Sequence, residues 1–559
     1  MYCARRSLSA VNRSDRIKWL RGCALAAAIL AIPASRAEAQ AHCWSHWQAI
    51  GAPIADFDRT TQLTVSSESV PAGVTRFGKA MIENCSVLTD TTPGQLRVQW
   101  QVMPAALIAH RNSEYPRPQQ DGLRWSGRGL SGSMMAAGAI RWGPFSAMIA
   151  PVVSYQKNEE YAIVPVTSPE LSPYGSFYHV NGIDRPQRFG PSDFWWVHPG
   201  QSFVRADAFG VAAGFSTENM RWGPARRNPL LMSGTAPGFA HFFIGTSKPI
   251  DIHIGHVGAE AIWGRLQESD YFDNNAANDE QLFAGLVAIF RPKHTGLTLG
   301  FTRAYLRTMP PEGLSLGEQI WGPYTGIRTN PMDPTNGDNQ LFSVFMSWVL
   351  PESGFEVYGE YARDDHWEDW RDFIMELDHS RAYTVGVEKV FALRRANHRL
   401  RIAGETTTLS MSGTYRSGRG GPSFYTHSQI AQGYTHQGQL LGAPIGPGSD
   451  AQHISADYFT PSVMGGVYVE RIRYDSDAYY ANFAYLYANR AHDAEWTIGA
   501  RAAGMVRNFE ILGEIGYSAR YNRDLVELRR TGEFTRDTNL GVTLGVAWLP
   551  RWGVSAGGN

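Results

Sequence analysis

The feature that most constrains this chain is an alternation of apolar residues with small or polar ones, repeated in segments of roughly ten residues. In the segment LTLGFTRAYL, Leu297, Leu299 and Phe301 lie on one face of an extended strand, and threonine, glycine and alanine lie on the other. The preceding segment, QLFAGLVAIF, is separated from it only by RPKHTG, a turn rich in proline and glycine. The two segments are therefore predicted to form a β-hairpin.

The polar face of another segment argues against a globular sandwich. In FEVYGEYAR, Phe355 and Val357 share one face of the predicted strand, while Glu356, Tyr358 and Glu360 share the other. A sandwich core would have to remove both carboxylates from water without replacing their hydration. The pattern favours a barrel whose outer surface faces lipid and whose lumen is polar.

The same pattern recurs along most of the chain. Further predicted strand pairs are 131–142 with 145–156, 202–208 with 210–218, 241–247 with 251–265, 340–349 with 355–363, 382–390 with 400–408, 454–473 with 477–489, and 495–506 with 510–521. A first strand at 96–108 and a last at 539–548 bring the total to about 18, an even number as single-chain barrels prefer. We predict an all-β fold, a transmembrane antiparallel β-barrel at residues 96–549, followed by a C-terminal tail at 550–559.

The connections between the predicted strands alternate in length. Turns such as LPESG and RPKHTG are short, whereas residues 157–200, 307–339, 364–381 and 409–453 form long polar segments rich in aromatic residues and glycine. Outer-membrane barrels have short periplasmic turns and longer extracellular loops. Long loops also tend to carry function.

The N-terminus has the pattern of a secretory signal peptide. Basic residues are followed by the apolar stretch CALAAAILAIPA at 23–34 and by Ala37-Glu38-Ala39, a small-x-small cleavage site. Residues 1–39 are therefore predicted to be removed by cleavage after about Ala39, which would deliver the chain to the cell outer membrane.

Residues 40–95 lack sustained alternation and include a possible short helix at Val74–Asn84. They are predicted to form a small, partly helical element on the periplasmic side. Cys43 and Cys85 are the cysteines that remain after cleavage, and in an exported protein two such residues favour a disulfide over a metal site.

Charge and histidine placement exclude other classes of function. The formal net charge is -1, with 51 basic and 52 acidic residues, so nothing favours nucleic-acid binding. The histidines are dispersed without a Cys/His cluster, and no metal or cofactor is predicted. Asp378, His379 and Ser380 are adjacent, and neighbouring residues of an extended strand point to opposite faces, so they cannot form a catalytic relay. The chain is predicted not to be an enzyme.

Four separated segments carry a more specific signal. They are DGLRWSGRGL at 121–130, FSTENMRWGPARRNPLLMSGTAPGF at 215–239, MELDHSRAYTVGVEK at 375–389 and GYTHQGQLLGAPIGPGSD at 433–450. Together and in this order they resemble the capsule-assembly Wzi family of outer-membrane proteins, over roughly residues 95–549. The resemblance implies an 18-stranded monomeric barrel with a small periplasmic helical element. It also implies a lectin for exported capsular polysaccharide rather than an exporter or an enzyme.

Two loops, at 216–237 and 409–453, contain the groups that polysaccharide recognition needs. Aromatic faces stack on sugars, amides and carboxylates bind hydroxyls, and arginine binds acidic sugars. The candidate ligand residues are Glu218, Arg221, Trp222, Arg226, Arg227 and Asn228 in the first loop and Tyr425, Tyr434 and His436 in the second. The alternative is that these side chains pair with one another inside the lumen and plug it. Both interpretations remain open at this point.

The sequence therefore predicts an outer-membrane barrel that binds capsular or extracellular polysaccharide without covalent chemistry and aids capsule assembly or surface attachment. Its expected partners are that polysaccharide and outer-membrane lipid. The main alternative is a carbohydrate-admitting porin with the same fold and an open lumen. A third is an outer-membrane hydrolase.

Overall fold

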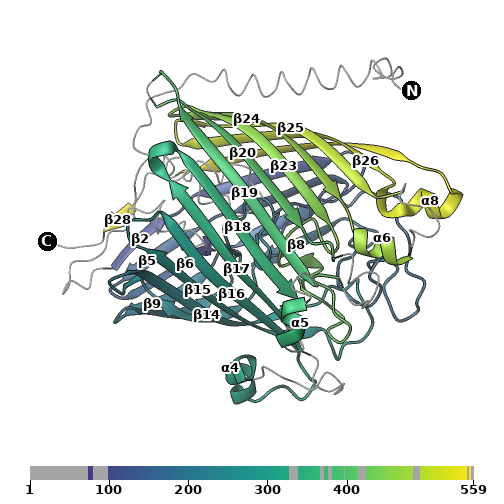
Figure 1. Cartoon of the computed structure of the whole chain (residues 1–559), viewed down its shortest axis with the longest axis horizontal. Helices are drawn as coiled ribbons and strands as arrows, with labels where there is room; N and C mark the ends of the chain where they lie inside the picture. The colour runs from purple at the N-terminus through teal and green to yellow at the C-terminus, as the bar shows by residue number, and fades with distance from the viewer. Residues whose placement is uncertain are drawn as a thin grey trace.

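The computed structural model describes residues 74–77, 79, 98–325, 338–364, 370–375, 380–395, 397–412, 423–482, 491–549 and 553–555 (Figure 1). Most of them belong to one closed antiparallel barrel. Its strands are β2 (Val98–Val102), β3 (Ala105–Asn112), β4 (Gly129–Met135), β5 (Gly138–Trp142), β6 (Phe145–Ile149), β7 (Val152–Gln156), β8 (Phe194–His198), β9 (Phe203–Ala208), β10 (Val211–Ser216), β12 (His241–Thr246), β13 (Ile250–Asp251), β14 (Gly255–Gln267), β15 (Glu280–Pro292), β16 (Leu297–Thr308), β17 (Asp338–Leu350), β18 (Phe355–Asp364), β19 (Arg381–Ala392), β20 (Arg399–Thr408), β23 (Asp450–Phe459), β24 (Val463–Arg473), β25 (Ala494–Val506), β26 (Phe509–Tyr521), β27 (Arg536–Trp548) and β28 (Gly553–Ser555).

Some of these 24 strands are two consecutive halves of one longer strand of the barrel wall. We call each full-length strand of the wall a stave, whether it is divided or continuous. Six staves are divided in this way: β2 and β3, β4 and β5, β6 and β7, β8 and β9, β12 and β13, and β27 and β28. Several breaks fall at Pro104, Pro151 and Pro199, which cannot donate to the strand ladder. Merging the six divided pairs leaves 18 staves in the described residues, and the predicted barrel of about 18 strands is confirmed.

Two of the individual strands were predicted wrongly, although the total is unaffected. The stretch 454–473 is not one strand but the end of β23 and the whole of β24. The two strands meet at a turn where the Thr460 hydroxyl accepts a hydrogen bond from the Val463 amide at 2.9 Å. The partner strand predicted at 477–489 is wrong in its first part, where helix α6 (Ser476–Asn482) lies. Residues 483–490 lie outside the described residues.

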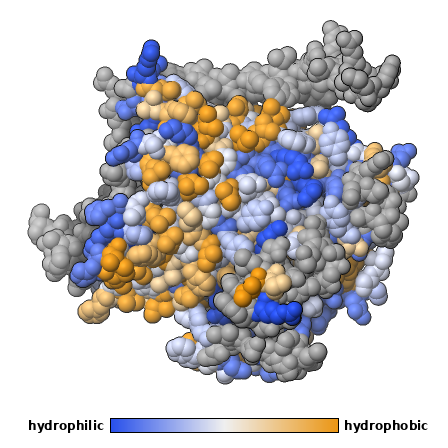
Figure 2. Space-filling view, in the orientation of Figure 1, coloured by the Kyte–Doolittle hydropathy of each residue, from blue (hydrophilic) through white to orange (hydrophobic). Residues whose placement is uncertain are grey.

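The alternation has the predicted orientation. Glu356, Tyr358 and Glu360 point into the barrel and are buried, while Val344 on β17 and Val467 on β24 are about half exposed. Figure 2 shows apolar side chains gathered in a broad band over the strands, with polar residues toward the loop end. No helix in the described part of the chain is long and apolar enough to cross a membrane.

The two ends of the barrel differ. Short connections such as 143–144, 209–210 and 507–508 lie at one end, together with the start of the first stave and the C-terminal strand (Figure 1). The long loops lie at the other end with the helices α5 (Trp370–Met375), α6 and α8 (Val526–Thr531). By the usual asymmetry of outer-membrane barrels, the loop end faces outward.

The two terminal segments differ from their predicted form. The helix expected at Val74–Asn84 begins instead as the strand β1 (Val74–Arg76), followed by helical backbone at Phe77 and Lys79, and its remainder lies outside the described residues. The C-terminal tail contains β28, which pairs with β2 beside the β27–β3 pairing and so extends the closing seam of the barrel. Cys43 and Cys85 lie outside the described residues, and their disulfide stays a prediction.

Candidate functional site

The lumen contains a plug made of three loops, residues 113–128, 217–240 and 423–449. Backbone hydrogen bonds join them, from Gly122 to Gly234 at 2.7 Å and from Ser233 to Leu441 at 2.7 Å. The plug holds two short ribbons, β11 (Met220–Trp222) paired with β1, and β21 (Thr435–His436) paired with β22 (Gln439–Leu440). Apolar residues of the 217–240 and 423–449 loops form one buried cluster with inward residues of the wall.

Trp222 lies at the centre of that cluster and is fully buried. Its ring centroid is 6.3 Å from that of Phe283 on β15. A Cβ built on Gly285 of the same strand would lie 2.5 Å from the Trp222 ring, so the indole needs a glycine at this point of the wall. In this arrangement the indole packs on protein and presents no face to a sugar.

The arginines of the plug are paired with glutamates of the wall. The guanidinium of Arg226 forms ion pairs with Glu356 at 3.4 Å and with Glu388, and that of Arg227 pairs with Glu470 at 3.0 Å. These charges are largely removed from water, so each one depends on its partner. Arg221 lies on β11 opposite Thr75 of β1.

A single carboxylate holds the tip of the 217–240 loop. The backbone N–H groups of Arg226, Arg227 and Asn228 donate to Glu405 on β20, at 2.8, 3.1 and 2.9 Å. The Tyr358 hydroxyl donates to the same carboxylate at 2.8 Å. Three backbone amides and one hydroxyl converge on this side chain, so Glu405 is an anchor of the tip.

The predicted residues of the other loop are equally enclosed. The rings of Tyr425 and Tyr434 are stacked, with centroids 5.5 Å apart, and their hydroxyls donate to the carbonyls of Leu230 and Leu231. His436 Nδ1 accepts from the Gln267 amide at 3.0 Å. Burial lowers the pKa of His436 to about 3, so the ring is neutral at physiological pH.

The nine predicted ligand residues thus lie together in the plug, although they come from two loops that are far apart in the sequence. Glu218 joins them at the N-terminal strand, where it accepts from the Lys79 amide at 2.7 Å and pairs with Arg76 at 3.4 Å. The observed contacts are those of the plug interpretation. Contact of these residues with polysaccharide stays a prediction.

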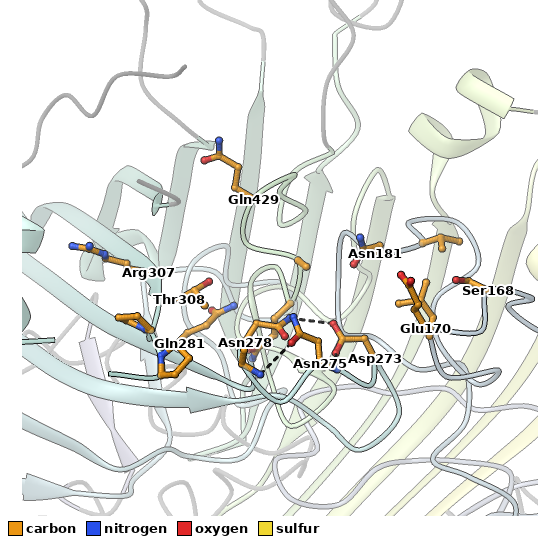
Figure 3. A pocket seen from close by; sticks show the side chains of 17 residues that line it. Ser168, Glu170, Asn181, Asp273, Asn275, Asn278, Gln281, Arg307, Thr308 and Gln429 are labelled. Carbon is orange, nitrogen blue, oxygen red and sulfur yellow. Dashed lines mark hydrogen bonds between the residues drawn. The ribbon is translucent and has the colours of Figure 1, made fainter. Parts of the chain in front are cut away.

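A second site, which the alternation of the sequence did not predict, lies at the loop end of the barrel. It is a cavity of about 730 Å³ between four loops (Figure 3). Its lining is mostly polar, with amides, carboxylates, hydroxyls and one guanidinium: Ser168, Glu170, Asn181, Asp273, Asn275, Asn278, Gln281, Arg307, Thr308, Gln429 and Gln432, with Leu171, Val180, Ala277, Pro310, Pro311 and Ala431. The run NNAANDEQ at 274–281, which lies mostly in the loop before β15, was the available signal, because it places four amide side chains within eight residues.

Two glutamines at the base of this cavity have unsatisfied acceptors. Gln281 and Gln432 are each 1% exposed, and the side-chain oxygen of each is buried without a hydrogen-bond partner. The Gln432 amide nitrogen is used structurally, donating to the carbonyls of Gln267 and Thr435. A buried acceptor without a donor costs the folded state about 1–3 kcal/mol.

Acidic groups gather beside the cavity. Within the described ranges, one group of three carboxylates, Glu268, Asp273 and Asp279, has oxygens within 4.8 Å of one another. Burial, followed by the charges of Asp184, Asp273 and Asp279, raises the pKa of Glu268 to about 9. Burial also raises the pKa of Asp184 to about 7 against the hydrogen bonds it accepts from Ser269. Acidic loops adopt such arrangements without an ion, and the absence of a metal stays a prediction.

These raised pKa values predict that the stability of the loop at 268–279, beside the cavity, depends on pH. In the folded state, the carboxyls of Asp184 and Glu268 keep their protons at pH values above their ordinary pKa of about 4. The stabilisation is therefore complete below that pH and is lost as the pH rises, through about 7 for Asp184 and about 9 for Glu268. Proteolytic cleavage within residues 268–279 should be faster at pH 9 than at pH 6.

The cleavage rate is to be normalised to that of an unstructured peptide, since the protease itself responds to pH. Replacing Glu268 with glutamine should remove most of the difference between the two pH values. Equal normalised rates for the unsubstituted protein would contradict the prediction.

Known proteins match this chain in sequence pattern and in fold. A family model described as capsule assembly protein Wzi matches residues 121–472. Among solved structures, the chain is similar to Escherichia coli Wzi, described as an outer membrane protein involved in group 1 capsule assembly and a carbohydrate binding β-barrel. That match has 12% identity and a TM-score of 0.53 and covers 80% of this chain and 85% of that one. At such identity it shows the fold alone.

More distant matches include OccK7 (OpdD) of Pseudomonas aeruginosa, with 11% identity, a TM-score of 0.36 and coverage of 82% of this chain and 100% of that one. OccAB3 of Acinetobacter baumannii matches with 8% identity, a TM-score of 0.40 and coverage of 81% and 98%. These scores carry no argument about this chain. No curated protein matches it.

Proposed function

Because this chain belongs to the capsule assembly protein Wzi family, we propose that it binds capsular or extracellular polysaccharide at the cell surface and helps a capsule to assemble or remain attached. The binding is noncovalent and uses no cofactor. The chain is exported by a signal peptide cleaved after about Ala39 and resides in the outer membrane. It acts as a monomer, as the resemblance to the family implies.

The observation that carries this proposal is the polar cavity at the outward end. A saccharide presents many hydroxyl groups, which suits a lining of amides, carboxylates and hydroxyls that includes the Gln281 side chain. Its volume of about 730 Å³ is in the range of small-ligand sites, so it would hold a short stretch of chain rather than a whole polymer.

The plug supports binding over the porin alternative. The tip of the 217–240 loop is anchored to Glu405 by three backbone amides, and its arginines are paired with wall glutamates. A porin needs a water-filled lumen, and breaking these buried charge pairs to create one would be strongly unfavourable.

Replacing Gln281 with leucine tests the cavity. The substitution removes a buried acceptor without a partner and keeps a similar volume, so stability should be unchanged or slightly higher. It also removes the side-chain amide from the cavity lining, so polysaccharide binding should weaken about tenfold, the value of one lost hydrogen bond. The measurement is retention of purified capsular polysaccharide by the reconstituted barrel, with urea unfolding of the same samples.

Gln99 provides a matched control, because its side-chain oxygen is also buried without a partner but lies on β2 at the opposite end of the barrel. Gln99→Leu should leave binding unchanged. Full binding by Gln281→Leu would remove the cavity as the site, and no retention by the unsubstituted protein of any polysaccharide tested would count against the function itself.

A further inference from the structure

Helix α4 (Leu316–Thr325) lies against the outer surface of the barrel, not over its mouth (Figure 1). The indole nitrogen of Trp263 on β14 donates to the Ile320 carbonyl at 3.3 Å, and the rings of Trp263 and Tyr324 meet edge to face at 6.0 Å. Trp263 points outward, because its neighbours Ile262 and Gly264 face the plug side. The helix is therefore held on the lipid-facing side of the wall.

The outward side chains of the wall beneath α4 are buried, whereas those on other parts of the wall are exposed. Leu282, Ala284 and Tyr305 alternate with plug-facing residues on β15 and β16, yet they are nearly fully buried in a cluster with Met309 that Trp263 and Leu314 pack against. Outward residues at a similar height elsewhere are exposed, including Trp195 on β8, Trp496 on β25 and Tyr521 on β26. These three mark an aromatic girdle at the outward ends of the strands, as expected where a barrel meets the membrane interface.

The side of α4 that faces away from the barrel is itself apolar, like the wall surface that the helix covers. Leu316 and Trp321 are 75% and 65% exposed, and Ile320, one turn after Leu316, is 41% exposed. The start of the helix is fixed by a reciprocal cap, in which the Ser315 hydroxyl accepts from the Glu318 amide and the Glu318 carboxylate accepts from the Ser315 amide at 2.9 Å. Polar groups thus sit at one end of an otherwise apolar outer side.

We propose that α4 lies in the outer leaflet of the outer membrane, with Leu316, Ile320 and Trp321 in contact with lipid acyl chains and the interfacial groups next to them. The helix has 10 residues, too few to span a bilayer, but an interfacial helix needs only one apolar side. The aromatic girdle indicates that lipid, and not another partner, contacts this surface. Where α4 packs over Trp263 and Tyr305, the exposed Trp321 provides the aromatic side chain at the membrane interface. This inference does not depend on polysaccharide binding.

The test uses a bimane fluorophore on a cysteine that replaces Trp321, in barrels reconstituted into phosphatidylcholine vesicles. The quencher is phosphatidylcholine with a nitroxide near its headgroup. Trp496→Cys is the matched lipid-facing control at the girdle, and Ala276→Cys, in an exposed loop, is the control in water. Unsubstituted protein labelled in the same way gives the background from native cysteines.

Quenching at position 321 is expected to be within about twofold of that at 496 and at least about threefold greater than that at 276, because nitroxide quenching requires a label in the lipid interface. Leu316→Cys should behave as Trp321→Cys does, so the test still holds if one of the two variants fails to fold. Folding is checked by comparing the gel migration of heated and unheated samples. Quenching at both positions no greater than at 276 would overturn the proposal. Shielding that grows with protein concentration would assign the surface to a second copy and would also overturn it.

Discussion

Replacing Glu405 with alanine is expected to detach the tip of the plug and to lower the free energy of unfolding by about 3–5 kcal/mol, the usual effect of breaking a buried charged contact. The carboxylate accepts three consecutive backbone N–H groups, from Arg226, Arg227 and Asn228, and the Tyr358 hydroxyl. Alanine leaves these donors buried without an acceptor, and each one costs additional free energy.

Two measurements check this result. Urea unfolding in vesicles gives the stability change, and planar bilayers give conductance, which should be low and unsteady in the unsubstituted barrel and should rise when the tip is released. Glu405→Gln is the matched control, since its amide oxygen still accepts hydrogen bonds, and its effect should be smaller. Glu312→Ala, an exposed position, should have none. Unchanged stability and conductance in Glu405→Ala would show that the tip is held elsewhere.

Replacing Trp222 with alanine is expected to cost about 3–5 kcal/mol, because it removes a fully buried indole from the centre of the plug and leaves a cavity. The barrel should still assemble, since the wall strands do not depend on this residue for their hydrogen bonds. If Trp222 instead reads sugars, the substitution would weaken polysaccharide binding with little loss of stability. The two interpretations therefore give opposite patterns in the same pair of assays.

Gly285 turns this prediction into a double-mutant cycle. Its Cβ position lies 2.5 Å from the Trp222 ring and 2.9 Å from Ile262, so Gly285→Ala should cost about 1–3 kcal/mol by overpacking. In the Trp222→Ala background the added methyl would enter the space left by the indole, and its cost should fall by about 1 kcal/mol or more. Additive costs would mean that the two residues do not touch.

The family signature lies mainly in the plug. Three of the four segments that carried the resemblance, at 121–130, 215–239 and 433–450, lie wholly or largely in the three loops that fill the lumen. The glycines and prolines in them suit close packing of irregular backbone, as Gly238 and Gly442 do where a Cβ would meet backbone oxygens at 2.1 and 2.2 Å. The same residues looked like sugar contacts because aromatic and arginine side chains serve both purposes.

The alternation of single residues was sufficient for the barrel. Period-two patterning fixes which side chains face lipid, so the polar row of Glu356 and Glu360 and the even strand number followed from local sequence. It failed at 454–489 because a three-residue turn and a helix start at Ser476 interrupt the pattern without a strong change in composition.

What only the tertiary structure decided is the contact between segments far apart in the chain. Glu405 and Arg226 are separated by 179 residues, and Tyr425 reaches the Leu230 carbonyl across 195. No local period records such pairings, since they depend on how loops from different staves meet inside the lumen. The same holds for the mouth cavity and for α4 on the outer wall. The sequence by itself determined the wall, because a strand's two faces are set residue by residue, and the fold determined what fills it, covers it and remains open to a ligand.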